Sequence, residues 1–210
     1  MIKYIIFDVG GVLQLTKYDD LGKGAHHVIG AHEYMAKKLR INIDTWFDSI
    51  DSSYVKSITN QIPKNKVISI ISHNLGISSK KFRKLIIKAY KKVFKKNRKL
   101  FSVAYKLKKN GYNIGILSDQ WHLSEEALIT PKNSKGFNPI VVSSRVGMRK
   151  PNIKIYKLLI RKCKCKPNEI LFIDNREWNL KPARKLGMKT ILFKNNKQTI
   201  KDLKKLKLLK

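Results

Sequence analysis

Cysteine is scarce in this sequence, and its scarcity excludes two kinds of site. The 210 residues include only Cys163 and Cys165, which are separated by a single lysine. Two thiols this close do not form an ordinary disulfide, and two alone are too few to build a zinc site. We therefore expect no structural disulfide and no zinc centre, and we interpret both cysteines as ordinary thiols.

Long apolar runs are also missing. No stretch reaches the roughly 18 to 20 apolar residues that a membrane-spanning helix requires. Asp8 interrupts the apolar run near the N-terminus before that run is long enough to act as a signal sequence. We expect a soluble, cytoplasmic protein whose 42% of hydrophobic residues suffices for one core and a modest inserted module.

Acidic residues are few: 14 Asp and Glu stand against 46 Lys and Arg, for a net charge of +32. Such a charge can serve a nucleic-acid partner, because bound phosphates release counterions. Here the charge is nearly all lysine and is spread along the chain, without the Arg-rich stripe with interleaved aromatic residues that base stacking uses. We therefore favour a small phosphorylated substrate over nucleic acid as the partner, and expect a monomer because the charge opposes self-association.

Five short apolar runs, rich in β-branched and aromatic residues, are typical of buried strands. Helical patterning precedes or follows each of them. This alternation predicts an α/β fold with a parallel sheet flanked by helices. The predicted strands cover residues 3–7, 112–117, 139–142, 169–173 and 189–193.

A helical insertion separates the first two predicted strands, because residues 15–99 contain several helical periods and no convincing strand. We interpret residues 15–99 as a helical cap domain, and residues 1–14 with 100–210 as the α/β core domain. A last lysine-rich helix is expected to be held by Leu203 and Leu206. The predicted helices cover residues 25–40, 45–58, 64–75, 79–96, 101–109, 152–163, 180–186 and 199–210.

Polar residues follow four of the predicted strands, at the ends where an open parallel sheet binds its ligands. Taken singly, each is an ordinary turn or capping residue. Together they suit phosphoryl transfer, in which a carboxylate attacks phosphorus and cations neutralise the phosphoryl oxygens. In chain order they are Asp8 with the Gly10-Gly11 turn, Ser118, Lys150, and Asp174 with Asn175.

These segments resemble, in order, the four motifs of the haloacid dehalogenase-like hydrolase superfamily. FDVGGVL is similar to motif one, ILSD to motif two, the lysine of GMRKPNIKIY to motif three, and LFIDNREWNLKPARKLGMKTI to motif four. The last two are similar to a subgroup that includes bacterial glucose-1-phosphatase and the N-terminal phosphatase domain of soluble epoxide hydrolase. The resemblance covers nearly the whole chain and implies a Rossmann-like fold with a small inserted helical cap.

The resemblance also implies a function. We expect a Mg²⁺-dependent phosphatase that hydrolyses a small phosphorylated metabolite, such as a sugar phosphate, through an aspartyl phosphate on Asp8. Lys150 is implied as the second catalytic residue. The implied phosphate-binding residues are Gly11, Ser118, Asp119 and Lys150, and the implied Mg²⁺ ligands are Asp8, the backbone carbonyl of Gly10, Asp174 and Asn175.

Two positions depart from the family pattern. Most phosphatases of this superfamily carry a general acid two residues after the nucleophile, where this chain has Gly10. Without this acid a factor of roughly 10² to 10⁴ in rate is at risk, unless the leaving group is good. Asn175 replaces a second aspartate, which removes one negative charge from the implied metal site, and Arg176 and Glu177 also depart from the motif. Candidates to replace the missing acid are Asp119, Asp19, Asp20, His26 and His27.

Two other functions stay open. A metal-independent 2-haloacid dehalogenase uses the same nucleophile and lysine. The presence of Asp174 argues against this function, because aspartate is a natural metal ligand. A catalytically degenerate domain that binds a phosphorylated ligand or nucleic acid is the other interpretation, and Gly10 and Asn175 motivate it. Metal dependence separates the first from the phosphatase, and salt-sensitive binding that persists in Asp8→Asn supports the second.

Overall fold

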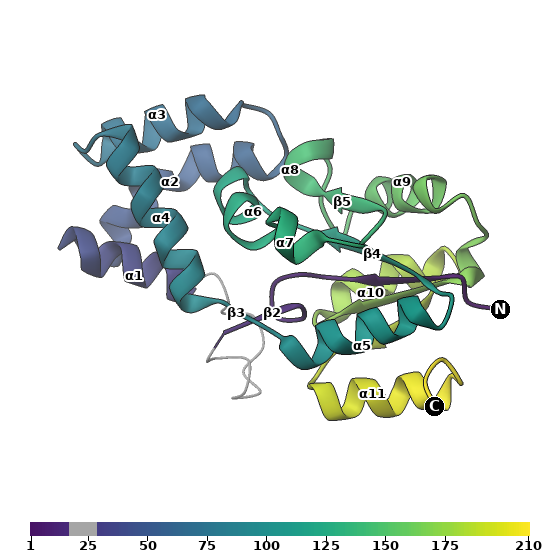
Figure 1. Ribbon diagram of the computed structural model, residues 1–210. Helices are drawn as coiled ribbons and strands as arrows, with labels where there is room; N and C mark the ends of the chain where they lie inside the picture. Colours follow the sequence, from purple (N-terminus) through teal and green to yellow (C-terminus); the bar gives the residue numbers. More distant parts are fainter. Residues whose placement is uncertain (17–28) are drawn as a thin grey trace.

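A five-stranded parallel sheet forms the centre of the computed structural model, which describes residues 1–16 and 29–210 (Figure 1). The strand order β5-β4-β1-β6-β7 places the N-terminal strand in the middle of the sheet. This arrangement confirms the α/β fold and the parallel sheet predicted from the sequence. The strands are β1 (Tyr4–Phe7), β4 (Asn113–Ser118), β5 (Ile140–Val142), β6 (Ile170–Asp174) and β7 (Lys189–Leu192).

Helices cover both faces of the sheet, which gives three layers (Figure 1). Along β1, Ile5 and Phe7 belong to a different apolar cluster from Ile6, because successive side chains of a strand point to opposite faces. Ile5 and Phe7 share theirs with helices α5 (Arg98–Lys109) and α11 (Asn196–Lys205), and Ile6 shares its cluster with α9 (Ile153–Cys163) and α10 (Glu177–Lys185).

Shorter elements connect these layers. Helices α6 (His122–Leu128) and α7 (Pro131–Ser134) lie between β4 and β5 in the chain, and α8 (Ser143–Val146) follows β5 directly. A 3₁₀ helix, η2 (Pro167–Glu169), leads into β6. Helices α6, α7 and α8 belong to the chain segments that follow the carboxyl ends of β4 and β5, and this is the edge of the sheet at which we expect a ligand.

Four helices form a lobe beside the core (Figure 1). They are α1 (Ile29–Leu39), α2 (Ile43–Ile58), α3 (Lys64–Asn74) and α4 (Ser79–Val93). Trp46, Phe82 and Ile86 are fully buried in the lobe. Glu126 of α6 links lobe and core, because its carboxylate lies 3.0 Å from Lys64 Nζ and 2.6 Å from Arg83 Nη2.

Two short antiparallel strands, β2 (Gln14–Leu15) and β3 (Lys95–Lys96), join the lobe to the core. The expectation that this stretch contains no strand is therefore wrong, and the helix expected over residues 79–96 ends at Val93, because Lys95 and Lys96 pair with β2. The boundaries expected for the cap domain fall inside β2 and inside the first turn of α5.

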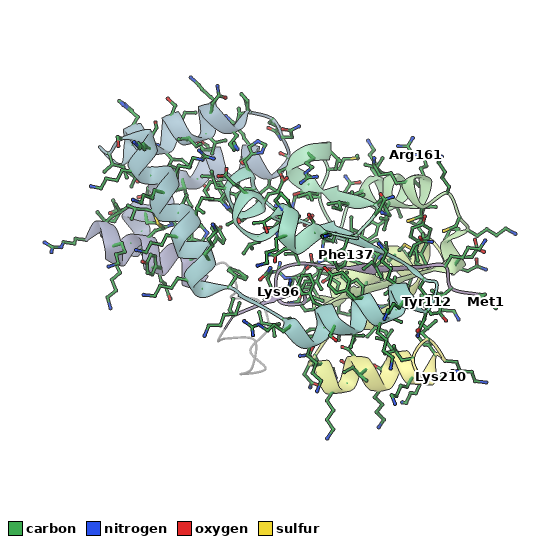
Figure 2. All side chains as sticks on the ribbon, viewed as in Figure 1. Met1, Lys96, Tyr112, Phe137, Arg161 and Lys210 are labelled. Atoms are coloured by element: carbon green, nitrogen blue, oxygen red, sulfur yellow. The ribbon has the colours of Figure 1, made fainter. Side chains whose placement is uncertain are left out.

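The C-terminal helix also differs from the expectation. Helix α11 ends at Lys205, and Leu206, expected to hold it, is 38% exposed. Leu203 is fully buried as expected, and Leu208 and Leu209 complete the contact instead. Within the described residues, no helix combines the length and apolar character needed to span a bilayer. Nitrogen-tipped side chains project from lobe and core alike (Figure 2).

Candidate active site

The sheet register brings the motif residues together. Phe7 of β1 pairs with Ile116 on one side and Ile173 on the other. Asp8 therefore follows its strand at the level of Asp174, because both lie one residue beyond that pair. The expected convergence of strand-end residues is present here.

Lys150 lies at the centre of this group and is 2% exposed. Its Nζ is 3.1 Å from Asp8 Oδ1 and 2.6 Å from Asp174 Oδ2, and it also donates to the Leu117 carbonyl at 3.4 Å. Burial alone would lower the pKa of Lys150, but the carboxylates of Asp174, Asp8 and Asp119 outweigh it and raise that pKa above the ordinary value. Lys150 is therefore a fixed positive charge beside Asp8.

Asp174 is fully buried and receives donors on both carboxylate oxygens. Besides Lys150, the Arg176 N–H donates to Oδ1 at 2.8 Å, and Asn179 Nδ2 lies 3.2 and 3.1 Å from Oδ1 and Oδ2. Burial raises the pKa of this carboxyl, Lys150 lowers it, and Asp8 raises it again, so the net direction is upward. Lys150 and the Arg176 N–H hold the carboxylate in one orientation.

Asp119, the residue that follows β4, faces the same lysine. Its Oδ1 accepts from the Lys150 backbone N–H at 3.0 Å, and its Oδ2 lies 3.9 Å from Arg149 Nε. The pKa of Asp119 is raised, chiefly by burial and further by the Asp8 carboxylate, while Lys150 and Arg149 oppose the shift. Both oxygens face donors, so the ionised form of Asp119 fits this position.

The two glycines after Asp8 differ in their backbone. Gly11 has a φ of 76°, and its N–H donates to the Gln14 carbonyl at 2.8 Å. This N–H is therefore engaged within the turn, and the phosphate contact expected from Gly11 finds no support in this geometry. Gly10 lies on the pocket wall, and a Cβ added there would meet nothing within 4 Å.

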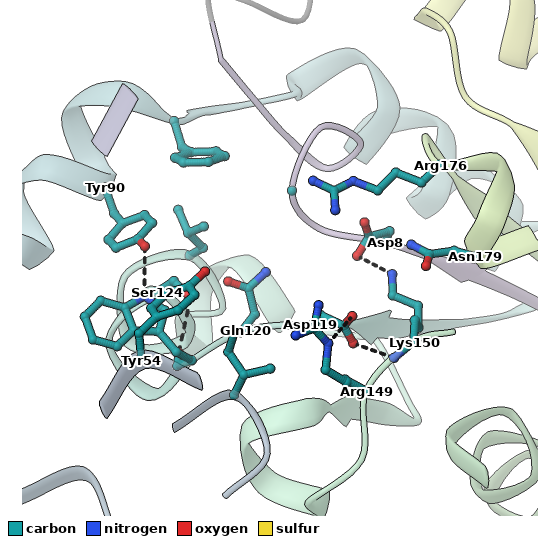
Figure 3. Close-up of a pocket in the computed structure, with 15 residues that line it drawn as sticks. Asp8, Tyr54, Tyr90, Asp119, Gln120, Ser124, Arg149, Lys150, Arg176 and Asn179 are labelled. Carbon is teal, nitrogen blue, oxygen red and sulfur yellow. Dashed lines mark hydrogen bonds and ion pairs between the residues drawn. The ribbon is translucent and has the colours of Figure 1, made fainter. Parts of the chain in front are cut away.

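A pocket of about 190 Å³ opens above Asp8 (Figure 3). Asp8, Gly10, Asp119 and Lys150 of the expected set line it, whereas Gly11, Ser118, Asp174 and Asn175 do not. Ser118 is fully buried, and its Oγ accepts from Gln120 Nε2 at 3.0 Å. The other lining residues are Tyr54, Ile58, Tyr90, Phe94, Gln120, Trp121, Ser124, Leu128, Arg149, Arg176 and Asn179.

Two cations of this pocket, Arg149 and Arg176, were not expected there from the sequence. Each lies close to a motif residue, one directly before Lys150 and the other two residues after Asp174, so adjacency to a motif was the available signal. Tyr90 and Phe94 were not expected there either, because helical spacing indicates only a core. The substitute acids Asp19, Asp20, His26 and His27 lie outside the described residues.

The carboxylates around Lys150 are oxygen ligands of the kind that a divalent cation accepts. Asp8, Asp119 and Asp174 surround one ammonium in a buried place, and Arg149 and Arg176 line the same pocket, so three carboxylates face three cations. Within residues 1–16 and 29–210, no group of three or more His, Cys, Asp or Glu side chains has the arrangement of a metal site. A Mg²⁺ ion here would therefore depend on backbone and amide oxygens as well as on carboxylates, which are ligands that it accepts.

The match to a protein family covers most of the chain and so shows which family the chain belongs to. A family model described as haloacid dehalogenase-like hydrolase matches residues 5–193. The chain belongs to the haloacid dehalogenase-like hydrolase family. This confirms the resemblance found in its motifs.

Two curated proteins show which relatives this hydrolase has. Mouse bifunctional epoxide hydrolase 2 is 29% identical over 229 residues, a match that covers 97% of the hydrolase but 38% of the mouse protein. Glyceraldehyde 3-phosphate phosphatase from Pyrococcus furiosus is 32% identical over 104 residues, which covers 47% of the hydrolase and 42% of the archaeal protein. The hydrolase thus spans less than half of the length of either relative.

Solved structures share the fold of the hydrolase. A family enzyme from Bacteroides thetaiotaomicron, an aspartate-to-alanine mutant in complex with magnesium and inorganic phosphate, has a TM-score of 0.71 at 22% identity, over 91% of the hydrolase and 93% of that chain. A dehalogenase has a TM-score of 0.55 at 20% identity, over 90% and 83% of the two chains. At these identities the likeness establishes the fold, and the chemistry has to be argued from the site.

Proposed function

We propose that this hydrolase is a phosphatase that cleaves a small phosphate monoester through an aspartyl phosphate on Asp8. The supporting observation is the Asp8 carboxylate on the pocket wall, with the Lys150 ammonium 3.1 Å from Oδ1. Among the described residues, Lys150 is the only hydrogen-bonding or ionic partner of this carboxylate, so Oδ2 is available to attack.

The first step transfers the phosphoryl group to Asp8. An Asp8 oxygen forms a bond to phosphorus while the bond from phosphorus to the ester oxygen breaks, and the leaving oxygen takes that electron pair. Lys150 stays charged and neutralises a phosphoryl oxygen as negative charge develops there. Arg149 and Arg176, which line the same pocket, are proposed to hold the remaining phosphoryl oxygens in place of Gly11.

The second step returns the enzyme to its starting state. Water attacks the phosphorus of the aspartyl phosphate, the bond from phosphorus to the Asp8 oxygen breaks, and inorganic phosphate leaves. Asp174 takes no part in bond making and acts through Lys150, which it holds at 2.6 Å. Asp119 likewise positions Lys150 and Arg149.

Mg²⁺ is the proposed cofactor. Asp8, the Gly10 carbonyl, Asp174 and Asn175 would hold it, and the ion would supply charge neutralisation to the phosphoryl oxygens when bound. Asp174 also accepts from Asn179 Nδ2 at 3.1 and 3.2 Å, longer contacts than those from Lys150 and the Arg176 N–H.

The size of the pocket favours a small substrate. Its volume of about 190 Å³ lies below the roughly 300 to 1,000 Å³ that is usual for drug-sized ligands. Residues of the lobe and of α6 wall it on the side away from the carboxylates. A small monoester therefore fits better than a polymer such as nucleic acid.

The test is phosphate release from 4-nitrophenyl phosphate with and without Mg²⁺. We expect Mg²⁺-dependent release by the wild type, none by Asp8→Asn, and normal release by Asp48→Asn, which removes an exposed carboxylate of α2. Metal-independent chloride release from 2-chloropropionate would show a dehalogenase instead. Absence of both reactions, with salt-sensitive binding to nucleic acid that survives Asp8→Asn, would show a binding domain.

A further inference from the structure

The pocket has two chemically different ends (Figure 3). Asp8, Asp119, Arg149, Lys150 and Arg176 form its charged end. The opposite end, which we call the apolar wall, combines side chains of the lobe with side chains at and within α6. The apolar wall consists of Tyr54, Ile58, Tyr90, Phe94, Trp121 and Leu128.

The aromatic rings of the apolar wall form one continuous surface. Trp121 lies 5.2 Å from Tyr54 and 6.4 Å from Tyr90, measured between ring centroids. Tyr90 in turn stacks on Phe94 at 5.9 Å. Rings at such distances attract one another, so the wall is held together before a ligand arrives.

Polar groups of three side chains near this wall, Trp121, Ser124 and Gln120, are already hydrogen-bonded within the protein. Trp121 Nε1 donates to the Tyr90 hydroxyl at 2.8 Å, and Ser124 Oγ donates to the Trp121 carbonyl at 3.1 Å. Gln120 Nε2 donates to Ser118 Oγ at 3.0 Å. A sugar brings several hydroxyl groups, each of which needs a partner when it leaves water, and this end of the pocket offers few.

Gly10, at the charged end of the pocket, bears on which leaving group the substrate can have. This residue supplies no carboxyl group to protonate the leaving oxygen. A phenol ionises with a pKa of about 10, as tyrosine does, whereas water ionises near 15.7 and an aliphatic hydroxyl behaves more like water. A phenolate therefore leaves without the proton that an alkyl alcohol requires.

We infer that the substrate is a small aryl phosphate, a phosphate monoester of a single phenolic ring, with its phosphate at Asp8 and its ring on the apolar wall. The inference rests on the proposed phosphatase function and names its substrate class. A cavity of about 190 Å³ admits one ring beside the phosphate and excludes an extended chain.

Binding and turnover test the inference separately. Binding of phenyl phosphate, benzyl phosphate, glucose 1-phosphate and inorganic phosphate is measured calorimetrically on Asp8→Asn protein with Mg²⁺, in which no turnover is expected. We expect both ring-bearing esters to bind about tenfold or more tightly than glucose 1-phosphate, as desolvated aromatic contacts allow. Equal or tighter binding of the sugar phosphate would overturn the inference, whatever the enzyme turns over.

Turnover by the wild type separates the effect of the ring on the rate from the effect of the leaving group. Benzyl phosphate carries the ring on an alkyl oxygen, so phenyl phosphate should be cleaved faster, and glucose 1-phosphate and glyceraldehyde 3-phosphate more slowly than either. Fast cleavage of the two sugar phosphates would overturn the inference but leave the phosphatase proposal intact. Ring-selective binding without any phosphate release would contradict the phosphatase proposal and support the ring site.

Variants of the apolar wall complete the test. Tyr54→Ala and Phe94→Ala should weaken phenyl phosphate binding about tenfold and leave inorganic phosphate binding unchanged. Phe47→Ala, which removes a 40% exposed ring of α2 outside the pocket, is the matched control and should bind phenyl phosphate as the wild type does. Equal loss for phenyl and inorganic phosphate would count against the inference.

Discussion

Lys150 and Asp174 form a 2.6 Å ion pair whose side chains are 1% and 0% exposed. The same ammonium is 3.1 Å from Asp8. A buried charge is tolerated only with its partners, so removal of one partner of such a pair costs far more stability than removal of one partner of a surface pair. The ion pair therefore links the stability of the fold to the position of Asp8, the proposed nucleophile.

The first prediction concerns that link. Lys150→Met removes the ammonium and leaves two carboxylates facing each other, so we expect a loss of about 3 to 5 kcal/mol in the free energy of unfolding. Phosphate release should disappear as well. Urea denaturation measures the first effect, with Lys64→Met as the control, because the exposed pair of Lys64 with Glu126 is worth at most about 1 kcal/mol. Equal losses in the two variants would contradict the prediction.

The second prediction concerns the general acid that Gly10 does not supply. Gly10→Asp should fold normally, because the new Cβ meets nothing within 4 Å and the backbone of Gly10 does not have a positive φ. A carboxyl at this place can protonate an alkyl leaving oxygen, so turnover of benzyl phosphate should rise, by up to a factor of roughly 10² to 10⁴. Gly11→Asp is the matched control: at a φ of 76° it should destabilise the fold and bring no gain. A Gly10→Asp variant that folds but cleaves benzyl phosphate no faster than the wild type would contradict the interpretation that a missing general acid at this position limits turnover.

The third prediction is a pH dependence set by Asp119. The ionised form holds Lys150 and Arg149, and burial raises the pKa of the carboxyl. Turnover should therefore fall as the pH drops through this raised pKa. Asp119→Asn still accepts from the Lys150 N–H but does not titrate, so its acid limb should lie at lower pH. If turnover of the wild type instead falls as the pH rises, and Asp119→Asn abolishes that fall, Asp119 is the missing acid.

Stability should also depend on pH, through His32 in the lobe. This side chain is fully buried, its Nδ1 accepts from Trp46 Nε1 at 2.7 Å, and burial lowers its pKa from 6.5 to about 4. The unfolded chain takes up a proton below pH 6.5 and the folded chain does not, so stability is complete above pH 6.5 and falls as the pH approaches 4. The total loss is about 3 kcal/mol. His32→Gln keeps an acceptor for the indole, and its denaturation midpoint should lack this part of the decline; an identical decline would exclude His32 as the cause.

Much of the fold was predictable because it depends on local patterns. The run before Asp8 and the run before Asp174 are short, apolar and rich in β-branched residues, which indicates buried parallel strands. The residues at their ends then had to meet, since parallel strands share one carboxyl edge. The same rule places Lys150, whose motif follows the third predicted strand, at this edge, but its ion pairs with Asp8 and Asp174 were not predicted.

Other features depend on contacts between distant segments and were not predictable. Strands β2 and β3 have two residues each, too short to show any periodicity, and exist because they pair with each other. Tyr54 and Tyr90 lie on helices, where the spacing of aromatic residues indicates only a core, and the packing of the lobe against α6 places them at the pocket. The engagement of the Gly11 N–H likewise follows from the position of the Gln14 carbonyl, which no motif indicates.

The central place of β1 also bears on how the chain folds as it is synthesised. Tyr4 pairs with Asn113 on one side and with Ile170 on the other, so β1 is synthesised well before either of the strands that it pairs with. Helices α1 to α4 pack largely on one another and on α6, so most of their partners are synthesised before β6. Asp8 is thus synthesised well before Lys150 and Asp174, the residues that complete its surroundings.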